Sequence, residues 1–157
     1  MAEQRLQTAQ LYFDSLKTLN GTTLEPLLAS NYSHSFAPAS INLSPTLDKQ
    51  GYIDRVAGIS TVWSTFPFVV NEWIESESSN QVTAWGLVIP EWVDAIKNGG
   101  GDPADWAVKA EYIFMFWFDA EGKVQRVVEF FDSKETDRLV GLFKKAQEIL
   151  AGKPGYA

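Results

Sequence analysis

The feature that most constrains the fold is a succession of four strand patterns in the middle and second half of the chain. Apolar and polar residues alternate there with the period of two that half-buried strands show. The predicted strands cover residues 68–75, 81–89, 108–118 and 123–131. Turn-forming residues at 77–80 and 120–122 separate the first pair and the last pair, which favours antiparallel neighbours.

Helical patterns lie on both sides of these strands. Apolar residues spaced three and four apart predict helical segments over residues 3–19, 24–29, 46–64 and 134–150. Ser44 or Thr46 is the expected cap of the third. Ahead of it, Tyr32, His34 and Phe36 alternate with serines as in a strand and should share one face. This order indicates an α+β fold in which helices cover one face of a mostly antiparallel sheet.

One long connection interrupts the order of strands. Residues 91–107 contain Trp92, Trp106 and three consecutive glycines, and connections of this length are typically lids, binding loops or mobile segments. No repeat or linker divides the 157 residues, so we expect a single domain over 1–157.

Charge and the scarcity of reactive side chains exclude several classes of function. A formal net charge of -7 without a basic cluster argues against binding to nucleic acid or to an anionic membrane surface. The absence of cysteine and the single histidine exclude thiol chemistry and multi-histidine metal sites. Since nucleotide-binding glycine motifs are also lacking, we expect no cofactor and no metal. The N-terminal sequence does not resemble a signal peptide, which predicts a cytoplasmic protein.

The last two predicted strands bring two glutamates together. Residues 118–123 (FDAEGK) fit a three-residue hairpin loop with Gly122 in the left-handed conformation. The register that follows sets Glu111 opposite Phe131 and Glu129 opposite Ile113. Both glutamates then lie roughly 7–8 Å apart on one face of the sheet, which they share with Met115, Trp117 and Val127.

Two carboxyl groups beside apolar surface resist ionising together. The pKa of at least one is then raised toward the range that suits general acid or base catalysis. Alternatively, Glu111 and Glu129 lie on an exposed or partner-facing side while the other side forms the core. A one-residue bulge is enough to exchange the two faces.

Other polar candidates have a structural and a functional interpretation. Asp132 precedes the last helix and has the spacing of a capping pair with Glu135, a role that can coexist with catalysis. His34 is the only side chain here whose unperturbed pKa is near neutral pH, and it shares a strand face with two aromatic residues, as a structural residue or as part of a pocket wall. Arg55 could form an ion pair with a pocket carboxylate or be solvated, and solvent is the favoured expectation. Arg126 is also expected to face solvent, on the strand face opposite Glu129.

The large rings must line a core or a cavity. The chain holds 6 Trp, 10 Phe and 5 Tyr, and aromatic residues make up 13% of it. Strand alternation cannot separate core from pocket for Trp63, Trp73, Trp85 and Trp117. Their number indicates that any ligand is apolar.

Several segments resemble the SnoaL-like branch of the ketosteroid-isomerase-like superfamily, the superfamily of nuclear-transport-factor-2-like (NTF2-like) proteins. The similarity extends over nearly the whole chain and is strongest to fungal-type proteins of natural-product pathways. The matching segments are YSHSF at 32–36, VTAW at 82–85, EYIFM at 111–115, FDAEGKV at 118–124 and VVEFFDSK at 127–134.

The resemblance implies a cone-shaped curved sheet wrapped around helices, with an internal apolar pocket and usually a homodimer. Members include polyketide cyclases, isomerases, dehydratases and epoxide hydrolases, which work without redox cofactors. By position, Glu129 resembles the last-strand acid of the epoxide hydrolases, and Asp132 resembles the strand-end acid of the cyclases. The arginine that those hydrolases place between two aspartates is not found here, which favours cyclisation or isomerisation.

The function predicted from the sequence is a cofactor-independent cyclase or isomerase of secondary metabolism. Its substrate would be a small hydrophobic polyketide or terpenoid-like molecule. His34 or Glu129 would move a proton, Asp132 or Glu111 would act as the complementary acid, and Tyr32 would stabilise an oxyanion. The alternatives are an epoxide hydrolase or dehydratase, or a noncatalytic binding or dimerisation module. The residues expected to contact substrate are Trp63, Trp85, Met115, Trp117, Phe131 and Phe36.

Overall fold

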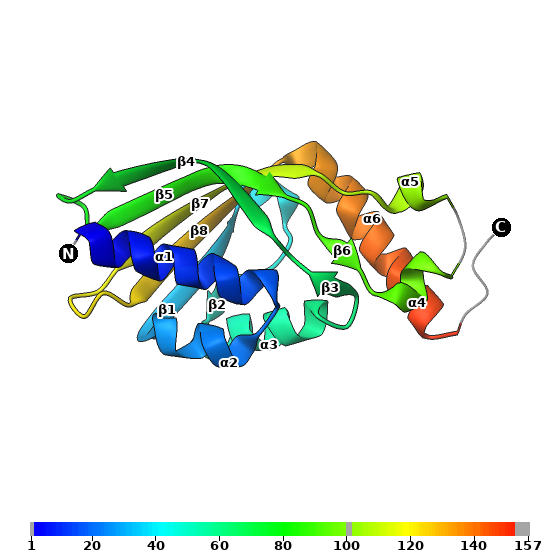
Figure 1. Cartoon of the computed structure of the whole chain (residues 1–157), viewed down its shortest axis with the longest axis horizontal. Helices are drawn as coiled ribbons and strands as arrows, with labels where there is room; N and C mark the ends of the chain where they lie inside the picture. The colour runs from blue at the N-terminus through cyan, green and yellow to red at the C-terminus, as the bar shows by residue number, and fades with distance from the viewer. Residues whose placement is uncertain (1, 100–101, 153–157) are drawn as a thin grey trace.

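Six strands form one strongly curved sheet in the computed structural model, which describes residues 2–99 and 102–152 (Figure 1). β1 and β8 run parallel, and every other neighbouring pair in this sheet is antiparallel. The predicted α+β class and the mostly antiparallel sheet are therefore confirmed. The order across the sheet is β2 (Leu47–Asp48), β1 (Leu28–Ala37), β8 (Val124–Phe131), β7 (Ala110–Phe118), β5 (Gln81–Val88) and β4 (Phe68–Ser76).

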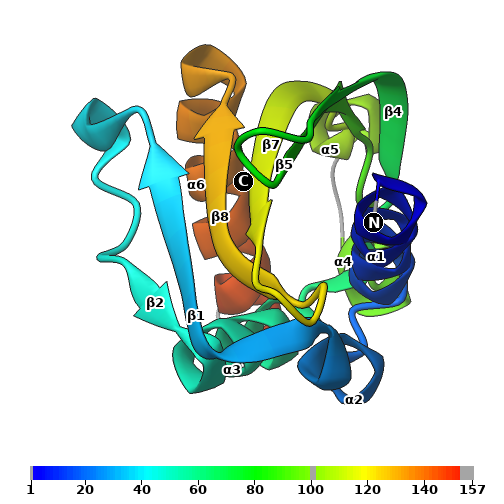
Figure 2. The same ribbon diagram turned by 90° about the vertical axis from the view of Figure 1, so that its left-hand side faces the viewer.

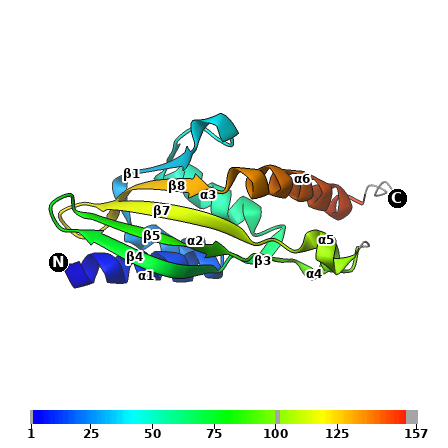
Figure 3. The same cartoon turned by 90° about the horizontal axis from the view of Figure 1, so that it is seen from above.

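The helices gather around the concave side of the sheet and beyond its end. Figure 2 shows α1 facing the hollow of the sheet and α3 closing its lower side, and Figure 3 shows α6 running on from β8 past the end of the strands. The short strands β3 (Trp63–Thr65) and β6 (Glu91–Trp92) pair separately. The helices are α1 (Ala2–Lys17), α2 (Gly21–Leu24), α3 (Lys49–Ile59), α4 (Asp94–Lys97), α5 (Pro103–Trp106) and α6 (Ser133–Leu150), with 3₁₀ turns η1 (Glu25–Leu27) and η2 (Ala39–Ile41).

Aromatic rings from α1 and the sheet form the core. Ring centroids lie 5.1 Å apart for Phe13 and Phe114 and 5.1 Å apart for Tyr12 and Phe116, both in edge-to-face geometry. Such pairs contribute about 0.5–1.5 kcal/mol each beyond the area they bury. The apolar stripe of α1 is thereby fixed against the centre of β7, which leaves the far half of the hollow to α3 and α6.

Two of the predicted helical segments have wrong boundaries. The third helix begins at Lys49, because the carboxylate of Asp48 accepts from the amide of Gly51 at 2.8 Å and caps it, and it ends at Ile59 rather than at Ser64. Neither Ser44 nor Thr46 is the cap. The short turn predicted over 24–29 ends at Leu27, since Leu28 already begins β1.

The register of the last hairpin differs from the prediction by one residue. The loop forms as expected, with Gly122 at φ 78° and the Asp119 carboxylate accepting from the amides of Glu121 and Lys123. The ladder then shifts between Trp117 and Phe118, which leaves Gln125 as an extra residue in β8. A bulge of this kind reverses the faces of everything beyond it.

The consequence is that Glu129 lies opposite Phe114 and not opposite Ile113. Residues 127, 129 and 131 of β8 therefore face the concave side with the buried rings of β7. Glu111 and Glu129 lie on opposite faces of the sheet, so their predicted pairing is wrong.

The connection over 91–107 is folded against the last helix. The indole Nε1 of Trp92 donates to the carbonyl of Trp106 at 2.6 Å. From α6, Arg138 donates to the carbonyls of Asp105 and Ala107, at 3.0 Å each. Gly100 and Gly101 lie outside the described residues. These contacts hold α6 across the open end of the sheet.

Gly86 is the position where the curvature of the sheet leaves no room for a side chain. A Cβ there would stand 2.3 Å from the carbonyl oxygen of Val69 and 2.9 Å from the ring of Phe68. We expect Gly86→Ala to lower the free energy of unfolding by about 1–3 kcal/mol or more, measured by urea denaturation. Gly58→Ala is the matched control, since a Cβ at that helical position meets nothing within 4 Å and should stabilise by about 0.5 kcal/mol. Equal effects of the two substitutions would contradict this account.

Candidate active site

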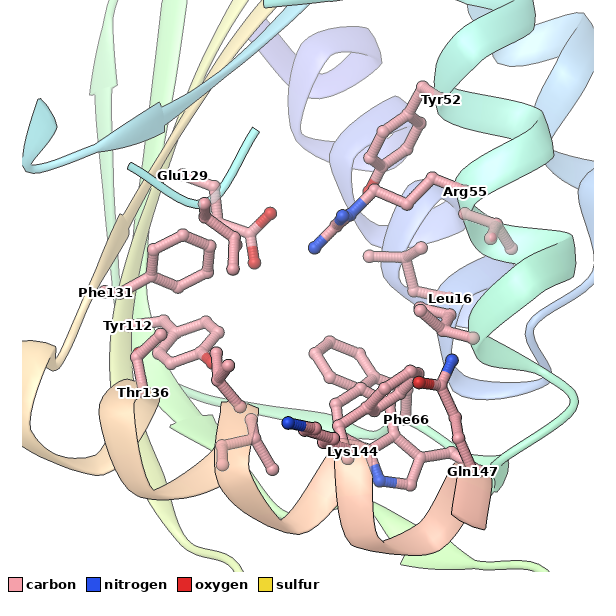
Figure 4. A pocket seen from close by; sticks show the side chains of 17 residues that line it. Leu16, Tyr52, Arg55, Phe66, Tyr112, Glu129, Phe131, Thr136, Lys144 and Gln147 are labelled. Carbon is pink, nitrogen blue, oxygen red and sulfur yellow. The ribbon is translucent and has the colours of Figure 1, made fainter. Parts of the chain in front are cut away.

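A cavity of about 310 Å³ lies between the concave face of the sheet, α3 and α6 (Figure 4). Most of its lining is apolar, including Trp63, Phe131 and Phe143. Among the described residues that line it, Glu129 is the only acidic one, and Arg55 and Lys144 are the only basic ones. A small apolar pocket with few, separate polar groups is typical of a site for a small organic molecule.

A chain of buried hydrogen bonds holds Glu129 from behind. Its Oε2 lies 2.9 Å from Nε2 of His34, whose Nδ1 lies 2.9 Å from the hydroxyl of Tyr32. The hydroxyl of Tyr32 lies 3.1 Å from that of Tyr12. His34 is fully buried, whereas Glu129 remains 6% exposed and reaches the cavity. Of the four, only Glu129 can touch a ligand in the pocket.

Burial keeps the groups behind Glu129 uncharged at neutral pH. Burial lowers the pKa of His34, although the hydrogen bond to Glu129 opposes this, so the imidazole is neutral near pH 7. Burial, followed by charge repulsion from neighbouring tyrosines, raises the pKa of Tyr12 and Tyr32 far above 10. With a carboxylate at Glu129, which can only accept, Nε2 of His34 carries the ring proton and donates to it, and Nδ1 then accepts from the hydroxyl of Tyr32.

Two further phenols face the same cavity. The ring of Tyr52 stacks on the imidazole of His34 with centroids 4.1 Å apart. Burial, and then the nearby Glu129, raises the pKa of both Tyr52 and Tyr112. At neutral pH these hydroxyls are protonated, and they can donate hydrogen bonds to an oxygen of a ligand but cannot serve as bases.

Arg55 faces the pocket, so its predicted position in solvent is wrong. It is half-buried, and its guanidinium lies over the ring of Phe36, 4.7 Å from the centroid. Figure 4 shows its side chain reaching into the cavity from α3, across from Glu129. A cation-π contact of this kind orients a guanidinium without using its hydrogen-bond donors.

The structure brings together some of the residues predicted for the site. Glu129, Phe131 and Trp63 line the cavity, and His34 and Tyr32 stand directly behind Glu129. The ring of Phe36 stacks on that of Phe131, with centroids 5.7 Å apart. Whether any of them acts in catalysis stays a prediction.

Other predicted residues lie elsewhere. Glu111, Trp85, Met115 and Trp117 lie on the outer face of the sheet, so their predicted place in the pocket is wrong. The indole of Trp85 donates to Glu111, and the guanidinium of Arg126 lies 4.3 Å from the ring centroid of Trp117. Arg126 is exposed, as predicted.

Asp132 does not line the cavity. Its carboxylate accepts from the amides of Lys134 and Glu135 at 3.1 and 3.2 Å, which confirms the predicted helix cap. With this carboxylate occupied by the first turn of α6, Glu129 is the remaining predicted acid that reaches the pocket.

The sequence analysis gave no role in the site to Tyr12, Tyr52 and Tyr112, and it favoured solvent over a pocket position for Arg55. Tyr12 and Tyr52 carry a hydroxyl within apolar helical stripes, and Tyr112 carries one within the buried face of β7. A polar atom at a core position was the available signal, because such an atom requires a partner.

The described residues, 2–99 and 102–152, contain no group of three acidic, histidine or cysteine side chains placed to hold a metal ion. Over the same part of the chain, no helix combines the length and the apolar character needed to cross a membrane.

Comparison with known proteins finds similarity in structure alone. No family model matches the sequence, and no curated protein matches it. Among solved structures, the BvnE pinacolase from Penicillium brevicompactum is 16% identical with a TM-score of 0.74, covering 88% of this chain and 90% of its own. PrhC from Penicillium brasilianum is 14% identical with a TM-score of 0.73, covering 96% of each chain. An NTF2-like protein from Burkholderia pseudomallei is 16% identical with a TM-score of 0.67, covering 87% of this chain and 97% of its own.

The chain has the NTF2-like fold. The resemblance to this superfamily inferred from the sequence is thereby confirmed at the level of the fold. In this NTF2-like chain the pocket opens between the cone-shaped sheet and two helices, as the resemblance implied, and Glu129 and Arg55 are its opposed charges.

The neutral, buried His34 makes stability depend on pH. Below about pH 6.5 the unfolded chain binds a proton on this histidine that the folded chain does not, so the free energy of unfolding falls as the pH falls. One such group contributes at most about 1.4 kcal/mol per pH unit. Urea denaturation at pH 7.5 and 5.5 should show a smaller loss for His34→Gln than for the wild type. The same loss in both proteins would show that His34 does not remain neutral.

Proposed function

We propose that this chain is a cofactor-independent enzyme of the cyclase or isomerase class that moves protons on a small hydrophobic substrate. The observation that carries the proposal is one carboxyl group, Glu129, placed in an apolar pocket and held there by a buried histidine. A fixed base beside a site that excludes water is a common arrangement for general acid and base catalysis. A substrate of polyketide or terpenoid type, as predicted from the sequence, fits the apolar lining.

In the proposed reaction Glu129 removes a proton from a carbon next to a carbonyl group. The C–H electron pair becomes a carbon–carbon double bond, and the carbonyl electrons move onto oxygen to form an enolate. The protonated Glu129 then returns the proton at another position, which completes an isomerisation. In a cyclisation the enolate carbon instead attacks a second carbonyl carbon, and the alkoxide formed there takes the proton.

His34 and Tyr32 act as positioning residues in this proposal. Neither lines the cavity, and the lowered pKa of His34 makes it a weak base. Their hydrogen bonds keep one carboxylate oxygen of Glu129 occupied and direct the other toward the substrate. Fixed orientation of this kind is part of what a general base requires.

The structural neighbours support the proposal only through the fold. One of them is a pinacolase, and the fold carries both enzymes and binding proteins. The noncatalytic alternative predicts that ligands bind in the pocket without any chemical change that depends on Glu129. Hydration of an epoxide predicts incorporation of oxygen from labelled water, which an isomerisation does not require.

Solvent hydrogen exchange tests the role of Glu129. The protein is incubated with 2-tetralone in deuterium oxide, and α-deuteration above the uncatalysed rate is followed by mass spectrometry. We expect Glu129→Gln, which keeps the shape but loses the base, to reduce the protein-dependent rate by about 10²-fold or more.

Asp132→Asn is the control, because an amide oxygen retains the cap of α6 while the acid is lost. It should exchange like the wild type. Wild-type exchange in Glu129→Gln, or equal losses in both variants, would remove Glu129 from the mechanism.

We also propose a homodimer formed by the outer face of the sheet. Exposed apolar side chains lie there on three adjacent strands: Trp85 is 38%, Ile113 37% and Phe130 43% exposed, and Ile113 pairs directly with Phe130. A contiguous exposed apolar patch of this kind is a frequent site of association.

Phe130→Glu should shift the mass measured by light scattering from dimer to monomer without unfolding the chain. A buried glutamate pair at a two-fold interface costs several kcal/mol. Leu11→Glu, at a residue 45% exposed on α1, should leave the mass unchanged. A wild-type monomer at micromolar concentration would refute the dimer.

A further inference from the structure

The guanidinium of Arg55 is a cation inside the pocket whose hydrogen-bond donors are unused. Among the residues that the structure describes, no hydrogen bond or ion pair to its side chain is found, and its contact is the face of Phe36. Phe36 in turn stacks on Phe131 at an interplanar angle of 9°, so the cation rests on a fixed aromatic pair. A guanidinium held in this way is oriented before any ligand arrives.

Glu129, the acid across the pocket, forms no ion pair with Arg55. The hydrogen bond of Glu129 goes to His34, and no ion pair joins Arg55 to Glu129 within 4.0 Å. A direct pair would satisfy both charges at once and close the space between them. Instead the two groups face each other across the cavity (Figure 4), which leaves room for a ligand group between an acceptor and a donor.

The other polar side chains of the described lining all carry a hydrogen-bond donor, and the hydroxyls of Tyr52, Tyr112 and Thr136 and the amide of Gln147 can also accept. Tyr52 and Tyr112 present protonated hydroxyls, and Nε1 of Trp63 is buried without a hydrogen-bond partner among the described residues. A ligand that satisfies these groups carries oxygen acceptors rather than positive charge. An enolisable carbonyl compound meets both demands, with its acidic carbon toward Glu129 and its oxygen toward Arg55.

We propose that Arg55 binds the carbonyl oxygen of the substrate and stabilises the enolate that forms on it, so that the substrates are enolisable carbonyl compounds with an apolar body. This inference rests on the proposed function. As the C–H electron pair moves into the new double bond, negative charge develops on oxygen next to the guanidinium, and the proton is on Glu129. Stabilisation of charge that appears only during the reaction lowers its barrier.

Binding of an enolate mimic tests the role of Arg55 without turnover. 4-Nitrophenolate carries its charge on an oxygen conjugated to a flat ring, and 4-nitroanisole is a neutral compound of similar shape. At a pH where the phenol is ionised, we expect the wild type to bind the phenolate at least about 10-fold more tightly than the anisole, an advantage that the charge-assisted hydrogen bonds of a guanidinium supply.

Arg55→Gln should abolish this preference, and Arg55→Lys, which keeps the charge but loses the planar fork, should retain only part of it. Arg126→Gln is the matched control, since Arg126 also lies over an aromatic ring but is exposed on the outer face of the sheet, away from the lining. It should leave the preference unchanged. Absence of a preference in the wild type, or its persistence in both Arg55 variants, would overturn the proposal.

The exchange assay separates this proposal from the proposed function. If Arg55 variants keep the phenolate preference while Glu129→Gln abolishes deuterium exchange, the role of Arg55 is overturned and base catalysis stands. If Arg55→Gln removes the preference while Glu129→Gln exchanges normally, the pocket binds enolate-like anions and the catalytic proposal fails. Loss of exchange in Arg55→Gln together with loss of phenolate preference supports both.

Discussion

The contact between His34 and Glu129 is the interaction on which the site depends. A carboxyl group in an apolar hollow is costly unless it is hydrogen-bonded, and only a buried partner can supply that bond without admitting water. His34 does so at 2.9 Å and is itself held by the hydroxyl of Tyr32. Removing either His34 or Glu129 would leave the other without its hydrogen-bond partner inside the cone. The pocket therefore depends on the hydrogen-bond chain behind it.

Parallel pairing of the first long strand with the last makes this contact possible. β1 and β8 are 86 residues apart in sequence between Ala37 and Val124 and yet lie side by side, with His34 opposite Val127 and Phe36 opposite Glu129. The histidine and the glutamate meet diagonally across that pair. α3 then places Tyr52 over the imidazole and Arg55 over Phe36, so one helix supports both sides of the site.

Local patterns were enough to predict much of the fold and only part of the site. The four long strands, the left-handed Gly122 and the cap formed by Asp132 follow from short-range chemistry, and all three are present. The bulge at Gln125 has no comparable signature in a single sequence. Because strand faces alternate, this extra residue places Glu111 on the sheet face opposite Glu129, outside the pocket. For Arg55 the sequence left a pocket position and a solvent position open, because the choice depends on how far α3 lies from the sheet. The single domain, the cytoplasmic location and the independence of cofactors stay predictions.

The hydrogen bonds between Arg138 and the backbone of the 91–107 connection allow the sequence of that connection to vary while the pocket keeps its shape. One wall of the pocket is α6. Arg138 of this helix is hydrogen-bonded to two backbone carbonyl groups of the 91–107 connection, those of Asp105 and Ala107, which fix its position. Every residue has a backbone carbonyl, whatever its side chain. The 91–107 connection can therefore vary in sequence and still hold α6 at the same distance from the sheet. A change in the shape of the pocket at that wall, in turn, requires no change at Glu129 and His34, which lie on the sheet.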